Sequence, residues 1–363
     1  MSVSAGIVGL PNVGKSTIFN AISSGKAQTA NYPFCTIDPN SGVVSVPDSR
    51  LNQITEIIPT KKIIPALLEL VDIAGLVKGA STGEGLGNQF LGHIKSVNAI
   101  LHVVRCFEST DITHVSGSVD PLRDTEIIDT ELMLKDLDTL EKNKMRLDKM
   151  RKSGDKEAMA KIEASQKAIE QINAGIPARR GLNEDEKALL ADLHLITVKP
   201  VLYVANVDEA GLKKDNEHVK KLRETAEKDN ALCIKICGKI EEELAELDEA
   251  DKKDFLTDLG LSEPGLNVLA RAAYDLLGLQ TFFTAGETEN RAWTVKKGST
   301  APQAAGVIHS DFERGFIKAE VYTLADLITY KSEAEIRNHG KIRLEGKDYL
   351  VKDGDIMFFK FNV

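Results

Sequence analysis

Short apolar runs alternate with amphipathic stretches along most of the chain. A buried strand is expected at residues 3–8, directly before a glycine-containing segment, and a helical pattern begins near Thr17. Further apolar runs of strand length occur at residues 66–71, 100–105, 200–205 and 232–236. Strands that alternate with helical patterns predict an α/β domain with a mainly parallel sheet.

Residues 122–196 interrupt this pattern. Two charged stretches, 122–150 and about 156–174, carry apolar positions at roughly heptad spacing and are separated by Ser153-Gly154-Asp155. We therefore expect a helical coiled-coil hairpin inserted into the α/β domain. Its apolar stripe is expected at Ile127, Leu134, Leu137, Leu140 and Leu147 in the first helix, and at Met159, Ile162, Ile169 and Ile172 in the second.

The C-terminal part of the chain mixes strand patterns with short helical ones. Strands are expected at residues 293–295, 316–321, 347–351 and 356–361, and helices at 300–308 and 323–328. These elements predict a small α+β domain. The expected division is an α/β domain formed by residues 1–121 and 197–278, a helical insertion at 122–196, and an α+β domain at 279–363.

The composition fits a folded protein with two or three cores, since 42% of the 363 residues are hydrophobic. No apolar run approaches the ~20 residues that span a bilayer, and the N-terminus lacks a signal-peptide pattern. We therefore expect a cytoplasmic protein with no membrane partner. The four cysteines lack C-x-x-C spacing and are interpreted as buried thiols, not as disulfide or zinc ligands.

The net charge of −9 argues against a chain that binds polyanions over its whole surface, but the charge is unevenly distributed. Residues 141–180 contain eleven Lys and Arg against six Asp and Glu, which is compatible with a nucleic-acid partner, although charge alone favours a solvated hairpin. Residues 279–363 contain twelve acids and twelve bases. RNA binding by this domain would depend on a patch geometry that the sequence does not show.

One motif predicts a specific chemistry. Residues 9–17 form a complete G-x-x-x-x-G-K-S phosphate-binding loop between an expected strand and an expected helix. In such a loop the backbone N–H groups surround the phosphates, the lysine meets the β- and γ-phosphates, and the serine hydroxyl binds Mg²⁺. A nucleoside triphosphate is therefore expected here. The residues predicted to bind it are Asn12, Val13, Gly14, Lys15, Ser16 and Thr17.

Two further segments are expected to sense the third phosphate. Asp72-Ile73-Ala74-Gly75 ends an apolar strand, where Asp72 can hold Mg²⁺ through water and the Gly75 N–H can meet the γ-phosphate. Thr36 lies in a polar segment between this motif and the phosphate-binding loop. Its hydroxyl is expected to complete the Mg²⁺ shell and its N–H to contact the γ-phosphate. A surface loop with an incidental threonine is the alternative.

The base-reading segment departs from the guanine-specific pattern. Asn206-Val207-Asp208-Glu209 follows the strand at 200–205, where guanine-specific proteins carry N-K-x-D. Glu209 is one methylene longer than the aspartate that pairs with guanine, and Val207 lacks the lysine stem that covers the base. Because a site built for paired hydrogen bonds discriminates strongly when they are lost, we expect ATP to be preferred over GTP. A backbone contact to the base is expected from Cys237-Gly238-Lys239.

These motifs, together with a C-terminal segment, resemble the YchF family of Obg-related P-loop ATPases over essentially the whole chain. The resemblance implies a Ras-like P-loop domain, a coiled-coil insertion and a ubiquitin-like β-grasp domain called TGS. It also implies ATP preferred over GTP, slow hydrolysis, and association with the ribosome or its large subunit. RNA contact is expected through the hairpin and the TGS domain, and we expect a monomer. The C-terminal segment is Gly306-Val307-Ile308-His309-Ser310-Asp311-Phe312-Glu313-Arg314-Gly315-Phe316.

The catalytic step depends on residues other than the usual glutamine. Ras-like enzymes carry a glutamine after D-x-x-G to orient water, whereas this chain has Leu76. The resemblance suggests that His114 approaches the γ-phosphate and accepts a proton from water beside Lys15; a loop histidine without such a contact is the alternative. His93 and His102 are weaker candidates. Asn12 is expected to help hold K⁺, as in similar proteins that lack the glutamine.

Three functions remain open. The first is an ATP-dependent regulatory switch in translation or stress response, whose hydrolysis the ribosome accelerates or gates. The second is an RNA-binding adaptor with incidental turnover, and the third is a GTPase of ribosome assembly. Ribosome-stimulated hydrolysis that Lys15→Ala abolishes would favour the switch, whereas salt-dependent RNA affinity that nucleotide does not change would favour the adaptor.

Overall fold

The computed structural model describes residues 3–24, 40–73, 92, 94–110, 114–150 and 156–362. Its contacts divide the chain into two compact units. The first unit comprises residues 1–43 and 69–269, and the second comprises 44–68 and 270–363. We describe each unit separately.

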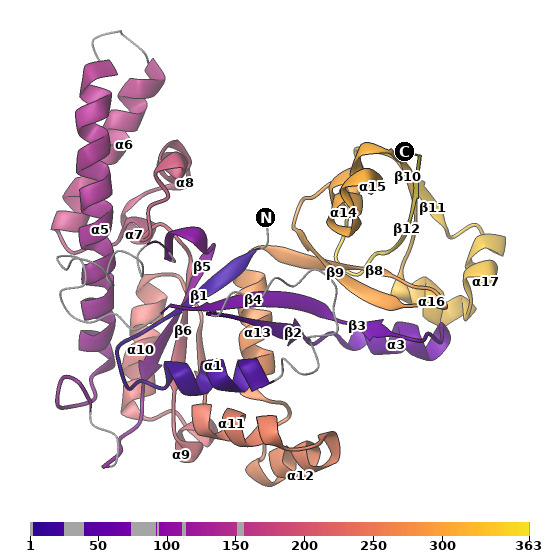
Figure 1. The fold of residues 1–363 in the computed structure, drawn as a ribbon, viewed down its shortest axis with the longest axis horizontal. Helices are drawn as coiled ribbons and strands as arrows, with labels where there is room; N and C mark the ends of the chain where they lie inside the picture. The colour runs from indigo at the N-terminus through magenta and orange to yellow at the C-terminus, as the bar shows by residue number, and fades with distance from the viewer. Residues whose placement is uncertain are drawn as a thin grey trace. The chain divides into compact units, whose positions relative to one another are not determined.

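A six-stranded sheet lies at the centre of the first unit, in the order β2-β4-β1-β5-β6-β7 (Figure 1). β1 pairs in parallel with β4 on one side and β5 on the other, and β6 and β7 continue the parallel pairing. Every residue of β1, β5 and β6 is buried, which explains their continuous apolar runs. The strands are β1 (Ser4–Val8), β2 (Ser41–Val46), β4 (Ala66–Asp72), β5 (Ala99–Arg105), β6 (Val201–Asn206) and β7 (Cys233–Ile236).

Helices connect these strands. α1 follows β1 directly, α10 packs on β6 and β7, and α11 packs against α1. The division between the units falls within α13. The helices are α1 (Lys15–Ser24), α9 (Glu209–Lys213), α10 (Glu217–Lys228), α11 (Gly238–Glu246), α12 (Glu249–Leu259) and α13 (Gly265–Leu276).

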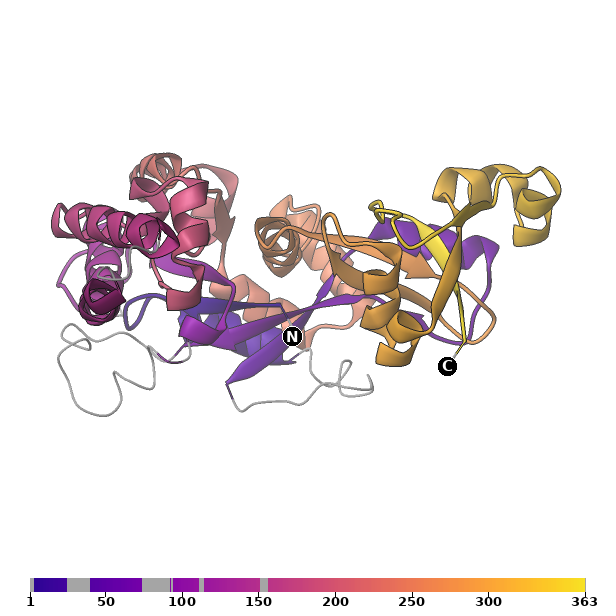
Figure 2. The ribbon, with the colours of Figure 1, turned by 90° about the horizontal axis from the view of Figure 1, so that it is seen from above.

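A helical insertion leaves the sheet after β5 and returns before β6. α5 and α6 lie side by side in both views (Figures 1 and 2) and share an apolar core with the returning segment. The elements are α5 (Pro121–Met150), α6 (Lys156–Asn173), α7 (Ala178–Gly181), α8 (Glu184–Leu189) and the 3₁₀ helix Ala191–Leu193.

The expected heptad stripe was wrong at two positions. Leu134 and Met159 are 44% and 43% exposed, whereas Met133, Leu140 and Ala164 are buried in the core of the insertion. The reason is that α5 packs on the returning segment as well as on α6. Its buried face is therefore wider than a two-helix seam and includes the adjacent position Met133.

The second unit also contains a six-stranded sheet, in the order β11-β10-β12-β8-β9-β3. α14 and α15 contact one face, where alanines of α14 pack against apolar side chains of β10 and β12. The elements are α3 (Ser49–Ile57), β3 (Ile63–Ile64), β8 (Leu279–Thr284), β9 (Asn290–Lys296), α14 (Ala301–Ile308), α15 (Ser310–Arg314), β10 (Phe316–Tyr322), α16 (Leu324–Tyr330), α17 (Glu333–Asn338), β11 (Arg343–Glu345) and β12 (Ile356–Phe361).

Residues 44–68 group with this second unit, unlike in the expected division. β3 pairs in parallel with β9, and the side-chain amide of Asn290 donates to the Ile58 carbonyl (2.8 Å) and to Thr55 Oγ1 (3.1 Å). These pairings join residues more than 220 positions apart, so no local pattern indicates them. The contacts of α3 and β3 therefore place them with the C-terminal sheet.

The strand expected at residues 347–351 was wrong. This segment is a turn, and only Leu350 makes an isolated bridge, to Thr300. Asp355 holds the turn by accepting hydrogen bonds from Tyr349 Oη (2.7 Å) and the Lys352 N–H (2.9 Å). These side-chain hydrogen bonds compete with strand pairing.

Candidate functional site

The phosphate-binding loop joins β1 to α1 at the centre of the first sheet. α1 begins at Lys15, and its first turn closes with the Ile18 N–H donating to the Gly14 carbonyl at 3.0 Å. Asn12 has a φ of 62°, a left-handed conformation that asparagine tolerates better than most residues. Since β1 lies between β4 and β5, the loop sits where ligands bind in open α/β sheets.

Lys15 and Asp72 interact electrostatically at this position. Lys15 is only 8% exposed, and its Nζ lies 3.4 Å from the Leu10 carbonyl. Burial lowers the pKa of Lys15 and raises the pKa of Asp72, and the attraction between the two groups opposes both shifts. Each charge therefore lacks full compensation from the protein alone.

Asp72 supplies a carboxylate oxygen that fits a hydrated cation. It ends β4 opposite Ile7 of β1, and its buried Oδ1 has no hydrogen-bond partner among the described residues. Such an atom normally finds water, an ion or a ligand. Ser16 is exposed in the first turn of α1. Within the described ranges, no group of three or more His, Cys, Asp and Glu could hold a metal by itself, so a cation here would need phosphate or water ligands.

Asn206 connects the loops of the site. Its Nδ2 donates to the Val13 carbonyl (2.8 Å), and its Oδ1 accepts from the Gly238 N–H (3.0 Å). A Cβ at position 14 would lie 2.1 Å from Nδ2, so only glycine fits beside this amide. Gly14 also has a φ of +94°. The sequence pattern predicted base contacts for Asn206 and Gly238, but in this structure they bond to each other.

The three residues after Asn206 differ in burial and in their contacts with α9. Val207 is buried and contacts α9, so its side chain is not placed to cover a base. Asp208 caps α9 by accepting from the Gly211 N–H at 2.8 Å. Glu209 is 63% exposed at its side chain, and its carboxylate lies 3.9 Å from Lys213 Nζ. Asp208 and Glu209 are both exposed to solvent, but one carboxylate oxygen of Asp208 is held by the α9 cap.

His114 is held by the protein at both ring nitrogens. Its Nδ1 accepts from the Ser116 N–H (3.1 Å), so Nε2 carries the proton and donates to Asp124 at 2.8 Å. Both side chains are 3% exposed. In this conformation neither nitrogen can accept a proton from water, in contrast to the role suggested for His114 by the family resemblance. The structure thus holds His114 as a buried partner of α5.

The other residues considered from the sequence lie near the phosphate-binding loop, in β5, or outside the described residues. Val13 is buried beneath the loop, and Thr17 lies in the first turn of α1 beside Gly238. His102 is buried in β5, where burial lowers its pKa to about 3, so it is neutral at physiological pH. The remaining predicted residues, Thr36, Gly75, Leu76, Cys35 and His93, lie outside the described residues.

A buried ionic network joins the helical insertion to the sheet. Arg179 of α7 donates from its guanidinium to Asp129 of α5 (2.7 Å) and through Nε to Asp229 after α10 (2.8 Å). Tyr203 of β6 donates to the same Asp229 carboxylate (2.6 Å). Asp136 of α5 likewise accepts from Thr197 just before β6. Asp129 and Asp136 lie on the buried face of α5, which the apolar pattern did not indicate.

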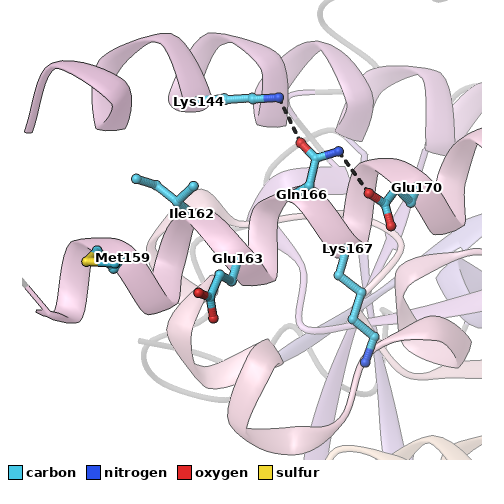
Figure 3. Close-up of a pocket in the computed structure, with 7 residues that line it drawn as sticks. All are labelled: Lys144, Met159, Ile162, Glu163, Gln166, Lys167 and Glu170. Carbon is cyan, nitrogen blue, oxygen red and sulfur yellow. Dashed lines mark hydrogen bonds between the residues drawn. The ribbon is translucent and has the colours of Figure 1, made fainter. Parts of the chain in front are cut away.

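Several cations of the basic stretch 141–180 already have protein partners. Arg179 and Arg180 both contact Asp229, and Lys167 lies 2.8 Å from Glu186. Figure 3 shows a groove along α6 in which Lys144 donates to Gln166 (2.7 Å) and Gln166 donates to Glu170 (3.0 Å). The polar groups of this groove largely satisfy one another. Fewer cations are therefore available to an anionic partner than the number of Lys and Arg in the sequence indicates.

Within the described part of the chain, no helix is long and apolar enough to cross a bilayer. The free cysteines Cys106 and Cys237 are buried and Cys233 is partly buried, and burial raises the pKa of Cys233 to about 11. These thiols are therefore protonated at neutral pH.

Two family models match the N-terminal and C-terminal parts of the chain. A family model described as 50S ribosome-binding GTPase matches residues 4–135, and the C-terminal model of YchF GTPases, described as a protein of unknown function (DUF933), matches residues 279–362. The protein named Ribosome-binding ATPase YchF from Bacillus subtilis is 54% identical over 366 residues. Its counterpart from Escherichia coli O157:H7 is 52% identical over 364 residues. Both alignments cover 100% of each chain.

Two solved structures are similar to this chain over nearly its full length. The Schizosaccharomyces pombe YchF GTPase is 39% identical and superposes with a TM-score of 0.88, covering 99% of this chain and 98% of the other. A GTP-binding protein from Pyrococcus horikoshii OT3, 21% identical with a TM-score of 0.62 over 99% and 100% of the two chains, shares the fold. With a P-loop-type sheet and full-length identity above one half to curated members, the chain belongs to the YchF family.

Proposed function

We propose that the chain is a ribosome-associated P-loop NTPase that binds and slowly hydrolyses ATP, in preference to GTP, with Mg²⁺. The observation that carries the proposal is the position of the buried Lys15 ammonium within electrostatic reach of Asp72, whose Oδ1 lacks a partner among the described residues. A triphosphate would compensate the ammonium, and a hydrated cation would compensate the carboxylate. The relatives named Ribosome-binding ATPase support the choice of ATP and of the ribosome.

The proposed roles follow from these positions. Lys15 binds the β- and γ-phosphates, while the N–H groups at the start of α1 face the same anion. Ser16 and Asp72 would hold Mg²⁺, Asp72 through water, and Thr36 and Gly75 are proposed to complete the γ-phosphate contacts. When bound, Mg²⁺ neutralises charge on the phosphate oxygens. K⁺ beside Asn12 stays a prediction. Contacts of Thr36 and Gly75 that depend on the γ-phosphate would make the protein a nucleotide-dependent switch of cytoplasmic translation.

Base preference provides the first test. The exposed Glu209 carboxylate at the start of α9 is proposed to disfavour guanine, because its longer stem shifts the two acceptor oxygens. Glu209→Asp is expected to shift the ratio of ATP to GTP affinity toward GTP by about ten-fold, roughly one good hydrogen bond. Equilibrium binding of non-hydrolysable ATP and GTP analogues measures this ratio.

Asp208→Asn is the matched control. The Asp208 side chain caps α9 by accepting from the Gly211 N–H, and Asn can cap a helix in the same way. This variant should leave the ratio unchanged. Unchanged ratios in both variants would refute the base-reading role of Glu209. A wild-type preference for GTP would instead favour the GTPase function, which the descriptions "50S ribosome-binding GTPase" and "YchF GTPase" support.

The proposed catalytic role of His114 requires that it leave the Asp124 contact. His114→Ala is then expected to lower kcat by ~10²-fold or more, with the Kd for ATP unchanged within three-fold. Single-turnover hydrolysis and equilibrium binding measure the two quantities. Loss of thermal stability is expected in either case, because the buried contact with Asp124 is removed. If His114 serves only as the buried partner seen here, the hydrolysis rate per folded molecule stays constant.

A further inference from the structure

The second sheet has an inner face, which packs on α14, and an opposite, outer face. In β10 and β12, alternate residues such as Ala319, Val321 and Phe359 point into the core against α14. The intervening residues therefore point to the outer face. The outer face is formed by Lys318, Glu320 and Tyr322 of β10, Leu344 of β11, and Ile356, Phe358 and Lys360 of β12.

α17 covers one end of this outer face. Tyr322 Oη donates to Glu333 of α17 at 2.5 Å, and both Tyr322 and Ile356, which lie opposite each other, are buried. α14 and α17 thus lie on opposite sides of the sheet (Figure 1). The outer face beyond the Tyr322 row, toward Lys318, is the part considered below.

This uncovered part carries large apolar side chains. Leu344 and Phe358 both lie opposite Glu320 and are 61% and 54% exposed. Ile317, at the register shift next to Lys318, is 55% exposed. Single exposed apolar residues are ordinary, but several at one end of one sheet indicate an interaction surface. We call this surface the outer strip: Ile317, Lys318, Glu320, Leu344, Phe358 and Lys360.

The charges of the outer strip are unbalanced. Glu320 is its one carboxylate and pairs with Arg337 of α17 at 2.7 Å. Arg337 first, then Lys360 and Lys318, hold the pKa of Glu320 below its ordinary value. Three cations around one carboxylate leave a local charge of +2, although the domain as a whole is neutral.

The two lysines of the outer strip lie directly opposite each other on β10 and β12. Like charges in this arrangement are destabilising. Neither Lys318 nor Lys360 has an ion-pair partner among the described residues, although both lie near enough to Glu320 to lower its pKa. A partner that brings carboxylates to this pair would relieve the repulsion.

The dimensions of the outer strip match those of one α-helix. Leu344 and Phe358 lie two strands apart, roughly 10 Å. Two side chains at positions i and i+7 of a helix lie about 10.5 Å apart along its axis. From the covered Tyr322 to Lys318 the strand rises about 13 Å, enough for the ~10–12 Å diameter of a helix that crosses the strands.

We propose that the outer strip binds an amphipathic helix of a partner protein. Apolar residues of that helix at i and i+7 would cover Leu344 and Phe358, and its acidic residues would meet Lys318 and Lys360. A second copy of the chain would bring the same cations against this face, so charge disfavours it.

A nucleic acid fits the outer strip less well than such a helix. The Lys360 Nζ lies 4.2 Å from the centroid of the Phe358 ring and occupies a position where a base would stack. Ile317 and Leu344 are aliphatic and offer a base no ring. The apolar side chains therefore favour a protein partner.

The experiment selects binders to the full chain from two displayed libraries of about 18-residue peptides, a length at which isolated helices begin to form. In the first library two leucines are fixed at i and i+7, and the other positions are drawn from Ala, Gln, Glu and Lys. In the second library alanines replace the two leucines. We expect enrichment from the first library alone, with Glu in excess over Lys.

The affinity of the most enriched peptide, measured by fluorescence anisotropy, then tests the residues. Leu344→Ala/Phe358→Ala removes both apolar anchors, and we expect it to weaken binding about ten-fold or more. Lys318→Gln/Lys360→Gln is expected to weaken binding about three-fold or more at low salt and to reduce its salt dependence.

Two control variants remove comparable side chains elsewhere. Leu134→Ala/Leu232→Ala removes two exposed leucines, and Lys252→Gln/Lys253→Gln removes two charges from α12. Both should leave the affinity for the peptide unchanged within about two-fold, because these positions lie far from the outer strip in the sequence and belong to the other unit.

Thermal unfolding checks the folding of every variant. The double lysine variant removes no apolar contact, so it decides the proposal even if the double alanine variant is less stable. A wild type that fails to bind ATP would count against the proposed NTPase function and would leave the peptide measurements valid.

The proposal is wrong if neither library is enriched, if the selected peptides are basic, or if both outer-strip variants keep the wild-type affinity. It is also wrong if single-stranded oligoadenylate or phosphatidylserine vesicles displace the labelled peptide as effectively as unlabelled peptide does. In that case the surface recognises negative charge alone, and the apolar anchors have no role.

Discussion

Lys15→Ala is expected to weaken ATP binding about 10- to 150-fold and to lower the hydrolysis rate by a further ~100-fold. The first effect is the loss of charge-assisted hydrogen bonds to phosphate. The second is the loss of a cation placed where charge develops during phosphoryl transfer. Equilibrium binding and single-turnover hydrolysis measure the two effects.

The same substitution should leave the apo protein folded. Burial lowers the pKa of Lys15, so its charge is held at a cost in the absence of phosphate. The free energy of unfolding without nucleotide should therefore change by less than about 1 kcal/mol, apart from the lost packing. Lys142→Ala, at an exposed position on α5, is the control of equal charge. Retention of ATP affinity within three-fold by Lys15→Ala would contradict the assignment of the site.

Arg179→Ala is expected to lower the free energy of unfolding by about 3–5 kcal/mol. It leaves the carboxylates of Asp129 and Asp229 enclosed without their guanidinium partner. Denaturant or thermal unfolding followed by circular dichroism measures the loss. Arg180→Ala, at a 31% exposed side chain that contacts the same Asp229, should cost far less, because Arg179 and Tyr203 still hold that carboxylate.

The loss caused by Arg179→Ala should depend on pH. Burial alone would raise the pKa of Asp229, but Arg179, Tyr203 and Arg180 together hold it below its ordinary value of 3.8. A depressed carboxylate pKa stabilises the fold above the unfolded-state pKa, and this contribution is lost as pH falls through the folded-state pKa. The difference between wild type and Arg179→Ala should therefore shrink below about pH 4. A difference independent of pH would mean that packing and not charge is lost.

The phosphate-binding loop could be predicted from the sequence because its chemistry is local. Glycines, Lys15 and Ser16 must be adjacent for one loop and one helix start to surround phosphate, and the strand before them is a buried parallel strand with a continuous apolar run. The strand that ends at Asp72 is buried at alternate positions, and apolar residues occupy most of it. Both could be placed without any long-range information.

The interactions that could not be predicted are those between distant segments. Asn206 was expected at the base; in the structure its amide bonds to the Val13 carbonyl and the Gly238 N–H, because the loops that follow the parallel strands β1, β6 and β7 lie at the same edge of the sheet. No sequence pattern distinguishes Asp129 and Asp136 from the exposed charges of the helical insertion, yet both are buried. Their burial follows from the segment that returns over α5.

The charge balance of residues 279–363 does not indicate where like charges lie together in the folded domain. Positive and negative side chains are equal in number there, and only strand register brings Lys318 and Lys360 together on one face with Phe358. Composition averages over both faces of a sheet, whereas a partner contacts one.

The pairing of β3 with β9 has a consequence for how the chain can be divided. A fragment starting at Leu279, where the C-terminal family model begins, would lack Ile63 and Ile64 and expose the backbone of β9 along one edge. An uncovered edge strand recruits other chains and promotes aggregation. The C-terminal sheet is thus completed by a piece of polypeptide made more than two hundred residues earlier, and during synthesis its folding has to wait until β12 has been made.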